Sequence, residues 1–206
     1  DLIKVESVGP PFRTNKVKIA EDGEILIRGE NVMLGYWNLK EETEKVIKDG
    51  WLHTGDIGEF DKNNYLKITD RKKDIIVNAG GDNISPSRIE EKLNIESAIS
   101  QSMVYGDFKN YLVAIIVPNK EQALLWAKEN NKKPEFSNLI KDEEFIKMIK
   151  EITSKINKNL SVIEQVRKFI LIDQEFTIEN DMMTPTMKIK RYKVKNIFGD
   201  QLEKLY

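Results

Sequence analysis

The hydrophobic pattern of this chain changes near Asp70, and that change constrains the fold more than any other feature. Before Asp70, apolar residues alternate with polar ones, which is typical of strands that bury one face. After Asp70, short apolar runs are mixed with segments of helical spacing. The two patterns predict an α+β protein with two separately packed parts, 1–70 and 71–206.

The first part reads as a small β-subdomain. Residues 17–27 alternate around the turn residues Glu21, Asp22 and Gly23 and predict a hairpin. Residues 40–48 predict a short helix, and residues 58–69 predict a second hairpin.

The second part predicts a three-stranded sheet with helices. Ser85 is expected to cap a helix that has Pro86 at its first position. Apolar residues spaced by four and three follow Asp142 and predict a long helix, and residues 192–206 predict a closing helix. Short apolar runs predict strands at 75–77, 103–105, 112–117 and 166–172.

Composition excludes several classes of function. The 206 residues include no cysteine, which excludes a disulfide framework, and a single histidine, His53, argues against a zinc site or a Ser-His-Asp triad. No apolar run approaches the ~20 residues of a membrane span, so no transmembrane segment is expected. With 33 basic and 34 acidic residues, the net charge of −1 gives no global attraction to nucleic acid.

Asp56 is the first candidate binding residue. It ends the segment Asp49–Asp56 (DGWLHTGD), and an ionised carboxylate can accept hydrogen bonds from both hydroxyls of a ribose. Thr-Gly-Asp is also ordinary turn chemistry. Arg71 is the second candidate, because a guanidinium suits ribose and phosphate oxygens. Its alternative role is a surface ion pair with Asp70 or Asp74.

Lys188 is the candidate catalytic residue. It lies in Thr184–Arg191 (TPTMKIKR), and an ammonium group can balance the charge that builds on a phosphate under attack. The alternative is a solvated basic face or a nucleic-acid patch. The residues of that face would be Lys188, Lys190, Arg191, Lys193 and Lys195.

These segments together resemble the adenylate-forming (AMP-forming) acyl-CoA synthetase superfamily. Gly23–Gly29, Val32–Tyr36 and Asn78–Pro86 extend the resemblance through the chain. The long-chain fatty acid CoA ligase branch matches best, because its members carry Thr-Pro-Thr-x-Lys near the C-terminus. Most relatives have Gly-Lys there, whereas this chain has Met187 before Lys188.

The resemblance implies that a fatty acid and ATP form an acyl-adenylate and pyrophosphate, and that CoA then displaces AMP. It makes Asp56 and Arg71 nucleotide-binding residues and Lys188 the catalytic residue of the first step. It places a hinge at Lys73, although Lys72 could also pivot, and a pantetheine-lining loop at Gly80 and Gly81. Paired glycines permit positive φ and close approach to a ligand.

The resemblance also implies that this chain is the C-terminal portion of a longer synthetase. The family's phosphate loop and its Tyr-Gly-x-Thr-Glu stretch are absent, and the chain does not begin with methionine. Residues 1–70 would then be the last subdomain of an N-terminal adenylation region, and residues 71–206 a mobile lid domain. The fragment is expected to be inactive alone. ATP/AMP and CoA are the expected ligands, with Mg²⁺ held by residues outside this chain and no metal ligand within it.

Other expectations remain open at this stage. No nucleic-acid partner and a cytoplasmic location are expected, while peripheral association with a membrane is left open. Two alternatives compete with the synthetase. One is a stand-alone, non-catalytic binding or regulatory module, and the other is an adenylate-forming ligase of another branch, such as one that loads an acyl carrier protein.

Overall fold

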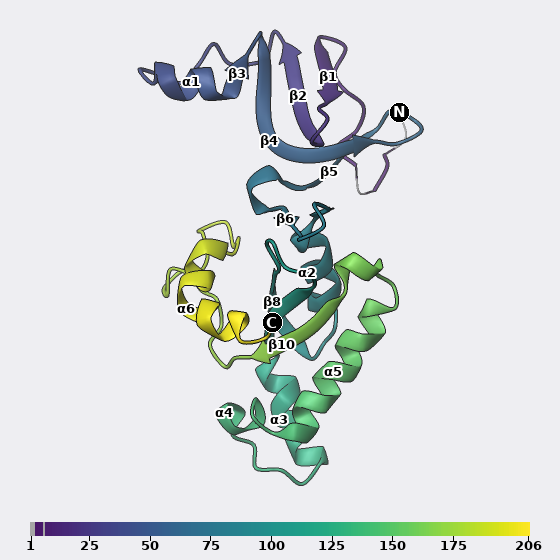
Figure 1. Ribbon diagram of the computed structural model, residues 1–206, viewed down its shortest axis with the longest axis vertical. Helices are drawn as coiled ribbons and strands as arrows, with labels where there is room; N and C mark the ends of the chain where they lie inside the picture. Colours follow the sequence, from purple (N-terminus) through teal and green to yellow (C-terminus); the bar gives the residue numbers. More distant parts are fainter. Residues whose placement is uncertain (1–2, 6) are drawn as a thin grey trace. The chain divides into compact units, whose positions relative to one another are not determined.

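The computed structural model describes residues 3–5 and 7–206 and divides into two compact units, one up to Ile75 and one from Ile76 to Tyr206 (Figure 1). Residues 1, 2 and 6 of the predicted first part lie outside the described residues. The division falls a few residues beyond the boundary expected after Asp70, because the last strand of the first unit continues to Arg71 and a short turn follows it.

The first unit is built around one antiparallel sheet and one helix. Strand β4 is central, since it pairs with β2, β3 and β5, and β1 pairs with β2. Its elements are β1 (Asn15–Ile19), β2 (Glu24–Gly29), α1 (Lys40–Val46), β3 (Ile47–Lys48), β4 (Trp51–Phe60), β5 (Leu66–Arg71) and the 3-10 turn η1 (Lys72–Asp74).

Both predicted hairpins are present. In the first, Val17 lies opposite Ile27, and Gly23 has a φ of +84°, which a residue without a side chain adopts at little cost. In the second, β4 and β5 pair antiparallel, and β4 begins at Trp51, earlier than expected. The buried side chains of Ile25 and Leu26 contribute to the core of this unit.

The helix predicted at 40–48 is shorter, because α1 ends at Val46 and residues 47–48 form β3. Asp49 and Gly50 have φ values of +51° and +75°, and Lys48 lies opposite Trp51. Two consecutive left-handed residues of the Asp-Gly type are the preferred two-residue hairpin turn. That turn forces the chain back as a strand and so ends the helix.

The second unit contains a sheet of three strands within the described residues, as expected, in the order β10–β9–β8. Strand β8 is antiparallel to β9, and β10 is parallel to it. The elements are β6 (Ile76–Val77), β7 (Asn83–Ile84), α2 (Pro86–Asn94), β8 (Ile99–Tyr105), β9 (Leu112–Pro118), α3 (Lys120–Glu129), α4 (Phe136–Leu139), α5 (Glu143–Asn157), η2 (Val162–Glu164), β10 (Val166–Leu171) and α6 (Arg191–Glu203).

Strand β9 separates two hydrophobic cores. Its residues are buried throughout, as expected for a strand covered on both faces. Leu112, Ala114 and Ile116 face one core, which is built with α2, α3 and α5. The alternate residues Val113 and Ile115 face the other core, to which α6 contributes. Figure 1 shows α5 and α6 on opposite sides of this sheet.

The predicted Ser85 cap is confirmed, and Asp142 caps the long helix α5 as well. The Ser85 side chain accepts a hydrogen bond from the Arg88 N–H, and Pro86 is the first residue of α2. The Asp142 side chain accepts from the N–H groups of Glu144 and Phe145. Each cap satisfies N–H groups that a helix leaves without an internal partner.

The closing helix buries a narrower face than the sequence predicts. Val194, Phe198 and Leu202, one helical turn apart, are buried, whereas Ile197 is half exposed. Across the described part of the chain, none of the helices combines the length and apolar character needed to cross a lipid bilayer.

Candidate functional site

Asp56 lies in an irregular bulge of strand β4. Opposite this bulge, Leu26 of β2 pairs with His53 and Glu24 pairs with Ile57, so that Thr54, Gly55 and Asp56 stand against Ile25 alone. Extra residues in one strand bend it and redirect side chains. Gly55 has a φ of +69°, so the bulge requires the left-handed conformation that glycine favours.

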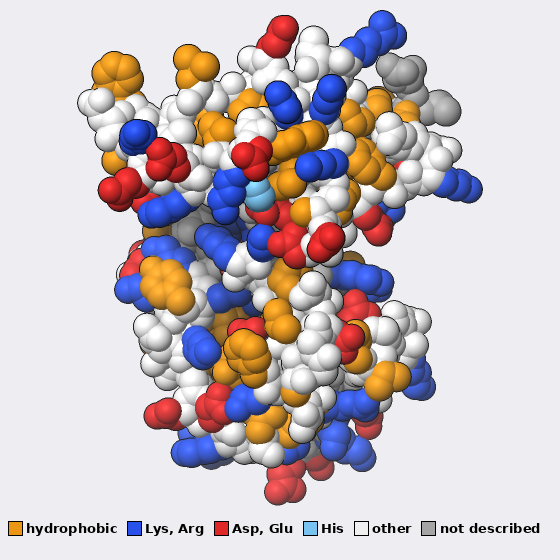
Figure 2. All heavy atoms as spheres, turned by 45° about the horizontal axis from the view of Figure 1, so that its top comes forward, with side chains coloured by type: hydrophobic (Ala, Val, Ile, Leu, Met, Phe, Trp, Pro, Cys, Tyr) orange, Lys and Arg blue, Asp and Glu red, His pale blue; other side chains and the backbone are white. Residues whose placement is uncertain are grey.

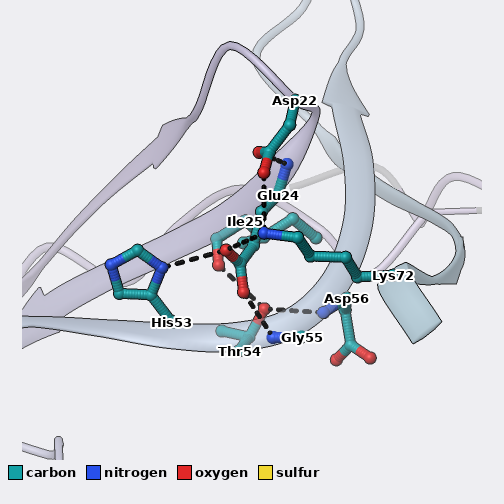
Figure 3. Close-up of polar contacts among 8 residues, drawn as sticks. All are labelled: Asp22, Glu24, Ile25, His53, Thr54, Gly55, Asp56 and Lys72. Atoms are coloured by element: carbon teal, nitrogen blue, oxygen red, sulfur yellow. Dashed lines mark hydrogen bonds and ion pairs between the residues drawn. The ribbon is translucent and has the colours of Figure 1, made fainter. Parts of the chain in front are cut away.

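Side chains replace the sheet hydrogen bonds that the bulge interrupts (Figure 3). The Thr54 hydroxyl donates to the Ile25 carbonyl at 2.8 Å and accepts from the Asp56 N–H at 3.1 Å. The Gly55 N–H donates to the Glu24 carboxylate at 2.9 Å. Every residue of the Thr-Gly-Asp sequence therefore has a defined hydrogen-bonding role in the bulge.

The structure brings Asp56 and Arg71 together. They are opposite one another in the β4–β5 pair, and the Arg71 Nε lies 2.8 Å from the Asp56 Oδ1. Among the described residues, Arg71 thus forms its ion pair with Asp56 and not with Asp74. Asp70 instead accepts a hydrogen bond from the Arg71 backbone N–H at 2.7 Å.

This ion pair leaves binding capacity on both partners. The Arg71 side chain is 52% exposed and that of Asp56 is 24% exposed. In Figure 3 the Asp56 carboxylate is directed away from the cluster around Glu24. An acceptor-only carboxylate beside a guanidinium with further N–H groups fits the hydroxyls and oxygens of a nucleotide.

Glu24, which the sequence analysis did not single out, is a buried carboxylate at the centre of a polar cluster whose other members are partly exposed. Its Oε2 lies 2.9 Å from the His53 Nδ1 and 3.0 Å from the Lys72 Nζ. Burial raises the pKa of Glu24, but the hydrogen bonds from His53, Lys72 and the Gly55 N–H outweigh it, and the pKa is lowered. The one sequence signal is a charged residue at the start of a buried apolar strand.

The two hinge candidates differ in their contacts. Lys72 forms ion pairs with Asp22 at 2.6 Å and with Glu24, and these carboxylates raise its pKa. Lys73 is exposed and has no ion pair with any described residue. The Lys72 side chain is therefore anchored to the first unit and the Lys73 side chain is not, although the Ile75 N–H donates to the Arg71 carbonyl at 3.1 Å and closes η1 around both residues.

The Gly80–Gly81 loop connects β6 and β7. The Asn78 side chain accepts from the N–H groups of Gly80 and Asp82, both at 2.9 Å, and the Ala79 N–H donates to the Lys109 carbonyl. Only Gly81 has a positive φ, +85°, so the glycine pair does not share that property. No atom lies within 4 Å of a Cβ placed on Gly81, which leaves its surface open.

Lys188 lies at the end of a tight loop of the second unit. The Thr184 N–H donates to the Lys188 carbonyl at 2.8 Å, and the Lys188 N–H donates to the Thr184 hydroxyl at 3.0 Å. Met187 has a φ of +61°, the left-handed region that favours glycine. The position where most relatives have glycine thus keeps the glycine-type backbone here despite the methionine.

Lys188 differs from the other basic residues of its segment. It is exposed and forms no ion pair with a described residue. Lys190 and Lys193 pair with Asp181, Arg191 pairs with Glu90 at 2.5 Å, and Lys195 lies over the Tyr105 ring at 4.9 Å.

The basic segment is therefore not a uniform solvated face, because three of its five residues form ion pairs with the two carboxylates of Asp181 and Glu90. On the face drawn in Figure 2, acidic and basic side chains are interspersed. Among the described residues, no three acidic or histidine side chains gather as metal ligands.

Comparisons with known proteins identify the family of this chain. Residues 73–206 match the family described as AMP-binding enzyme C-terminal domain. The long-chain-fatty-acid–CoA ligase FadD15 of Mycobacterium tuberculosis is 38% identical over 206 residues, covering 99% of this chain and 34% of the relative. Long-chain-fatty-acid–CoA ligase 1 of Homo sapiens is 36% identical over 214 residues, covering 97% and 31%. The chain thus spans about a third of the length of these relatives.

Solved structures show the same fold. The adenylation domain of a carboxylate reductase from Mycobacterium chelonae has a TM-score of 0.79 and 25% identity, covering 96% of this chain and 31% of its own. That of a carboxylic acid reductase from Segniliparus rugosus, in complex with AMP and a co-purified carboxylic acid, has a TM-score of 0.78 and 26% identity, covering 96% and 32%. The predicted α+β fold and the resemblance to adenylate-forming enzymes are confirmed, and the chain belongs to the AMP-binding enzymes, whose C-terminal domain it carries at residues 73–206.

Proposed function

We propose that this chain is the C-terminal part of an AMP-forming long-chain fatty acyl-CoA synthetase. The complete enzyme would join a fatty acid to CoA through an acyl-adenylate, releasing pyrophosphate and AMP. Sequence identity of 36–38% over almost the whole chain to long-chain-fatty-acid–CoA ligases supports this substrate class.

The observation that carries the proposal is the isolated charge of Lys188. When a carboxylate attacks the α-phosphate of ATP, negative charge builds on the phosphoryl and departing oxygens. An ammonium group about 4 Å away, at an effective dielectric constant near 20, stabilises that charge by about 4 kcal/mol, roughly three decades in rate. A lysine already paired with a carboxylate would first have to break that pair, and Lys188 has no such pair among the described residues.

Asp56 and Arg71 would hold the nucleotide, with the carboxylate accepting from the ribose hydroxyls and the guanidinium donating to neighbouring oxygens. They form one side of a site whose phosphate loop is not in this chain. The chain alone is therefore expected to bind AMP weakly and to catalyse no ATP–pyrophosphate exchange. Sub-micromolar binding of AMP by the isolated chain would contradict this division of the site.

The Gly80–Gly81 loop would line the path of the CoA pantetheine arm in the second half-reaction. The open surface at Gly81 supports close approach of a ligand. Gly81→Leu is expected to slow thioester formation from supplied acyl-adenylate by about tenfold, through side-chain bulk and left-handed strain of about 1–2 kcal/mol. Gly81→Asn separates bulk from strain, because asparagine has a side chain of similar size to leucine but tolerates the left-handed backbone.

Mg²⁺ would accompany ATP and screen its phosphates. Its ligands would be the phosphates and one or two carboxylates from residues outside this chain. We also propose a cytoplasmic location, which the absence of cysteine supports and which cell fractionation would test.

A second candidate function is loading of a carrier protein. A carboxylic acid reductase didomain with a fused carrier protein, from Segniliparus rugosus, is 26% identical over 96% of this chain, with a TM-score of 0.74. The intact protein should be given a long-chain acyl-adenylate with either free CoA or a phosphopantetheinylated carrier protein. Preferential thioester formation with CoA supports the synthetase, and preference for the carrier protein supports the second candidate. If the protein forms no thioester with either thiol and catalyses no ATP–pyrophosphate exchange, the result supports the non-catalytic module.

A further inference from the structure

The Glu24 carboxylate joins two segments that are distant in sequence. It is 4% exposed and has three hydrogen-bonding partners. Oε1 accepts from the Gly55 N–H in the β4 bulge, while Oε2 contacts His53 of β4 and Lys72 of η1. One side chain thus connects the bulge that carries Asp56 with the turn at the end of the first unit.

The burial of this charge requires an explanation, because an unpaired carboxylate in an apolar strand is costly. An apolar side chain at residue 24 would avoid that cost and continue the run Ile25–Leu26, but it would leave the Gly55 N–H and the Lys72 ammonium without this acceptor. The partners of Glu24 therefore account for its presence.

Consecutive residues of the junction are held by different carboxylates, one in the bulge and two in or next to the neighbouring strand β2. Arg71 pairs with Asp56, and Lys72 pairs with Glu24 and with Asp22 of the β1–β2 turn. Lys73 follows with no ion pair to a described residue. Ion pairs between the junction and described residues thus end at Lys72, while a backbone hydrogen bond from the Ile75 N–H to the Arg71 carbonyl at 3.1 Å closes the turn η1 around Lys73.

We propose that Glu24 is a positioning residue that holds the nucleotide-binding bulge and the start of the interdomain junction, up to Lys72, in one rigid body, so that rotation of the lid begins beyond Lys72. The inference rests on the proposed function, because it gives the bulge and the junction their roles. In this arrangement the bulge that binds the nucleotide keeps its shape, while the backbone of the junction beyond it changes conformation.

The test uses the intact protein that contains this chain. Glu24→Gln removes the charge of the carboxylate, and Lys72→Met removes the contact of Glu24 with the junction together with the Lys72–Asp22 ion pair. Glu59→Gln and Lys62→Met are matched controls, because both residues are exposed and form no ion pair with a described residue. Amide hydrogen exchange of residues 53–57 and 71–75, and the KM for ATP in pyrophosphate exchange, are the measurements.

Glu24→Gln is expected to speed amide hydrogen exchange in residues 53–57 and in residues 71–75. It is also expected to raise the KM for ATP by about tenfold, because a charge-assisted hydrogen bond is lost. Lys72→Met is expected to speed amide hydrogen exchange only in residues 71–75. The KM for ATP should stay within about twofold of that of the unaltered protein, because the Glu24–Gly55 contact survives. In residues 53–57 the double variant should match Glu24→Gln, since Lys72 reaches the bulge through Glu24, whereas residues 71–75 should loosen further because the Lys72–Asp22 ion pair is lost as well.

Protection of 71–75 that is unchanged in Lys72→Met would overturn the proposal, as would equal loosening of both segments by that variant. If Glu24→Gln does not fold, Lys72→Met decides alone. If the unaltered protein shows no pyrophosphate exchange, the proposed function fails, while the hydrogen-exchange comparison still decides whether Glu24 couples the two segments.

Discussion

The Asp56 bulge and the Lys188 loop position a charged residue with the same backbone feature but differ in whether that residue has an ion-pair partner. Each charge directly follows a left-handed residue, Gly55 at +69° or Met187 at +61°. Asp56 is then paired with Arg71, whereas Lys188 has no ion pair with a described residue.

This difference fits two functions, binding of a ligand and stabilisation of a transition state. A binding residue gains from being held in place, because less conformational entropy is lost when the ligand arrives. A cation that must stabilise charge appearing only in the transition state is most effective when no resident anion already satisfies it. Changes at Asp56 should therefore affect mainly the binding of ATP, and changes at Lys188 should affect mainly the rate of acid activation.

The largest effect is expected for Lys188→Ala in the intact protein. Acid activation, measured by ATP–pyrophosphate exchange, should fall by about two to three decades, while conversion of supplied acyl-adenylate to acyl-CoA stays nearly unchanged. Lys195→Ala, in the same basic segment, is the control and should change neither step by much. Equal slowing of both half-reactions by Lys188→Ala would mean that the lysine acts through folding or general binding.

Asp56→Asn should affect binding of the nucleotide more than the rate at saturation. Loss of charge-assisted hydrogen bonds predicts a rise in the KM for ATP of about one to two decades, with a smaller change in kcat. Glu59→Gln, on the same strand, should leave the KM as it is. A fall in kcat at constant KM would place Asp56 in the transition state and break the comparison.

The Glu24 cluster should make the stability of the protein dependent on pH. Because the folded-state pKa of Glu24 lies below its ordinary value of 4.5, its stabilising contribution is present above that value and is lost as the pH falls through the folded pKa. Glu24→Gln should therefore lower the free energy of unfolding at pH 7 by about 1–3 kcal/mol, and by less as the medium becomes more acidic. Denaturant unfolding across pH measures this, and a constant difference would exclude titration of Glu24 as the cause.

The smallest effect is expected for Met187→Gly. A left-handed backbone costs a residue with a side chain about 1–2 kcal/mol, and the greater freedom of unfolded glycine offsets about 0.4–1 kcal/mol of the gain. Thermal unfolding should show a net stabilisation of about 1 kcal/mol or less. Destabilisation would show that the exposed Met187 side chain makes contacts that favour the loop as it is.

The parts of the fold that depend on local chemistry could be predicted from the sequence. The β1–β2 hairpin follows from alternation around Gly23, and α2 and α5 begin at Ser85 and Asp142 because those side chains cap free N–H groups. Helix α3 (Lys120–Glu129) was not assigned, since it buries only Ala123 and Ala127 and carries a weak apolar signal.

By itself, the sequence also determined which residues were candidates for the site: Asp56, Arg71, Lys73, Gly80, Gly81 and Lys188 were all named from its segments. Only the tertiary structure decided their partners. The bulge that sets Arg71 opposite Asp56, and the burial of Glu24 between His53 and Lys72, depend on the register of strands that are distant in sequence. Likewise, Lys188 and Lys190 look alike in sequence, and only the position of Asp181 distinguishes the paired lysine from the unpaired one. Ion pairs are contacts in space, and residue order alone does not specify them.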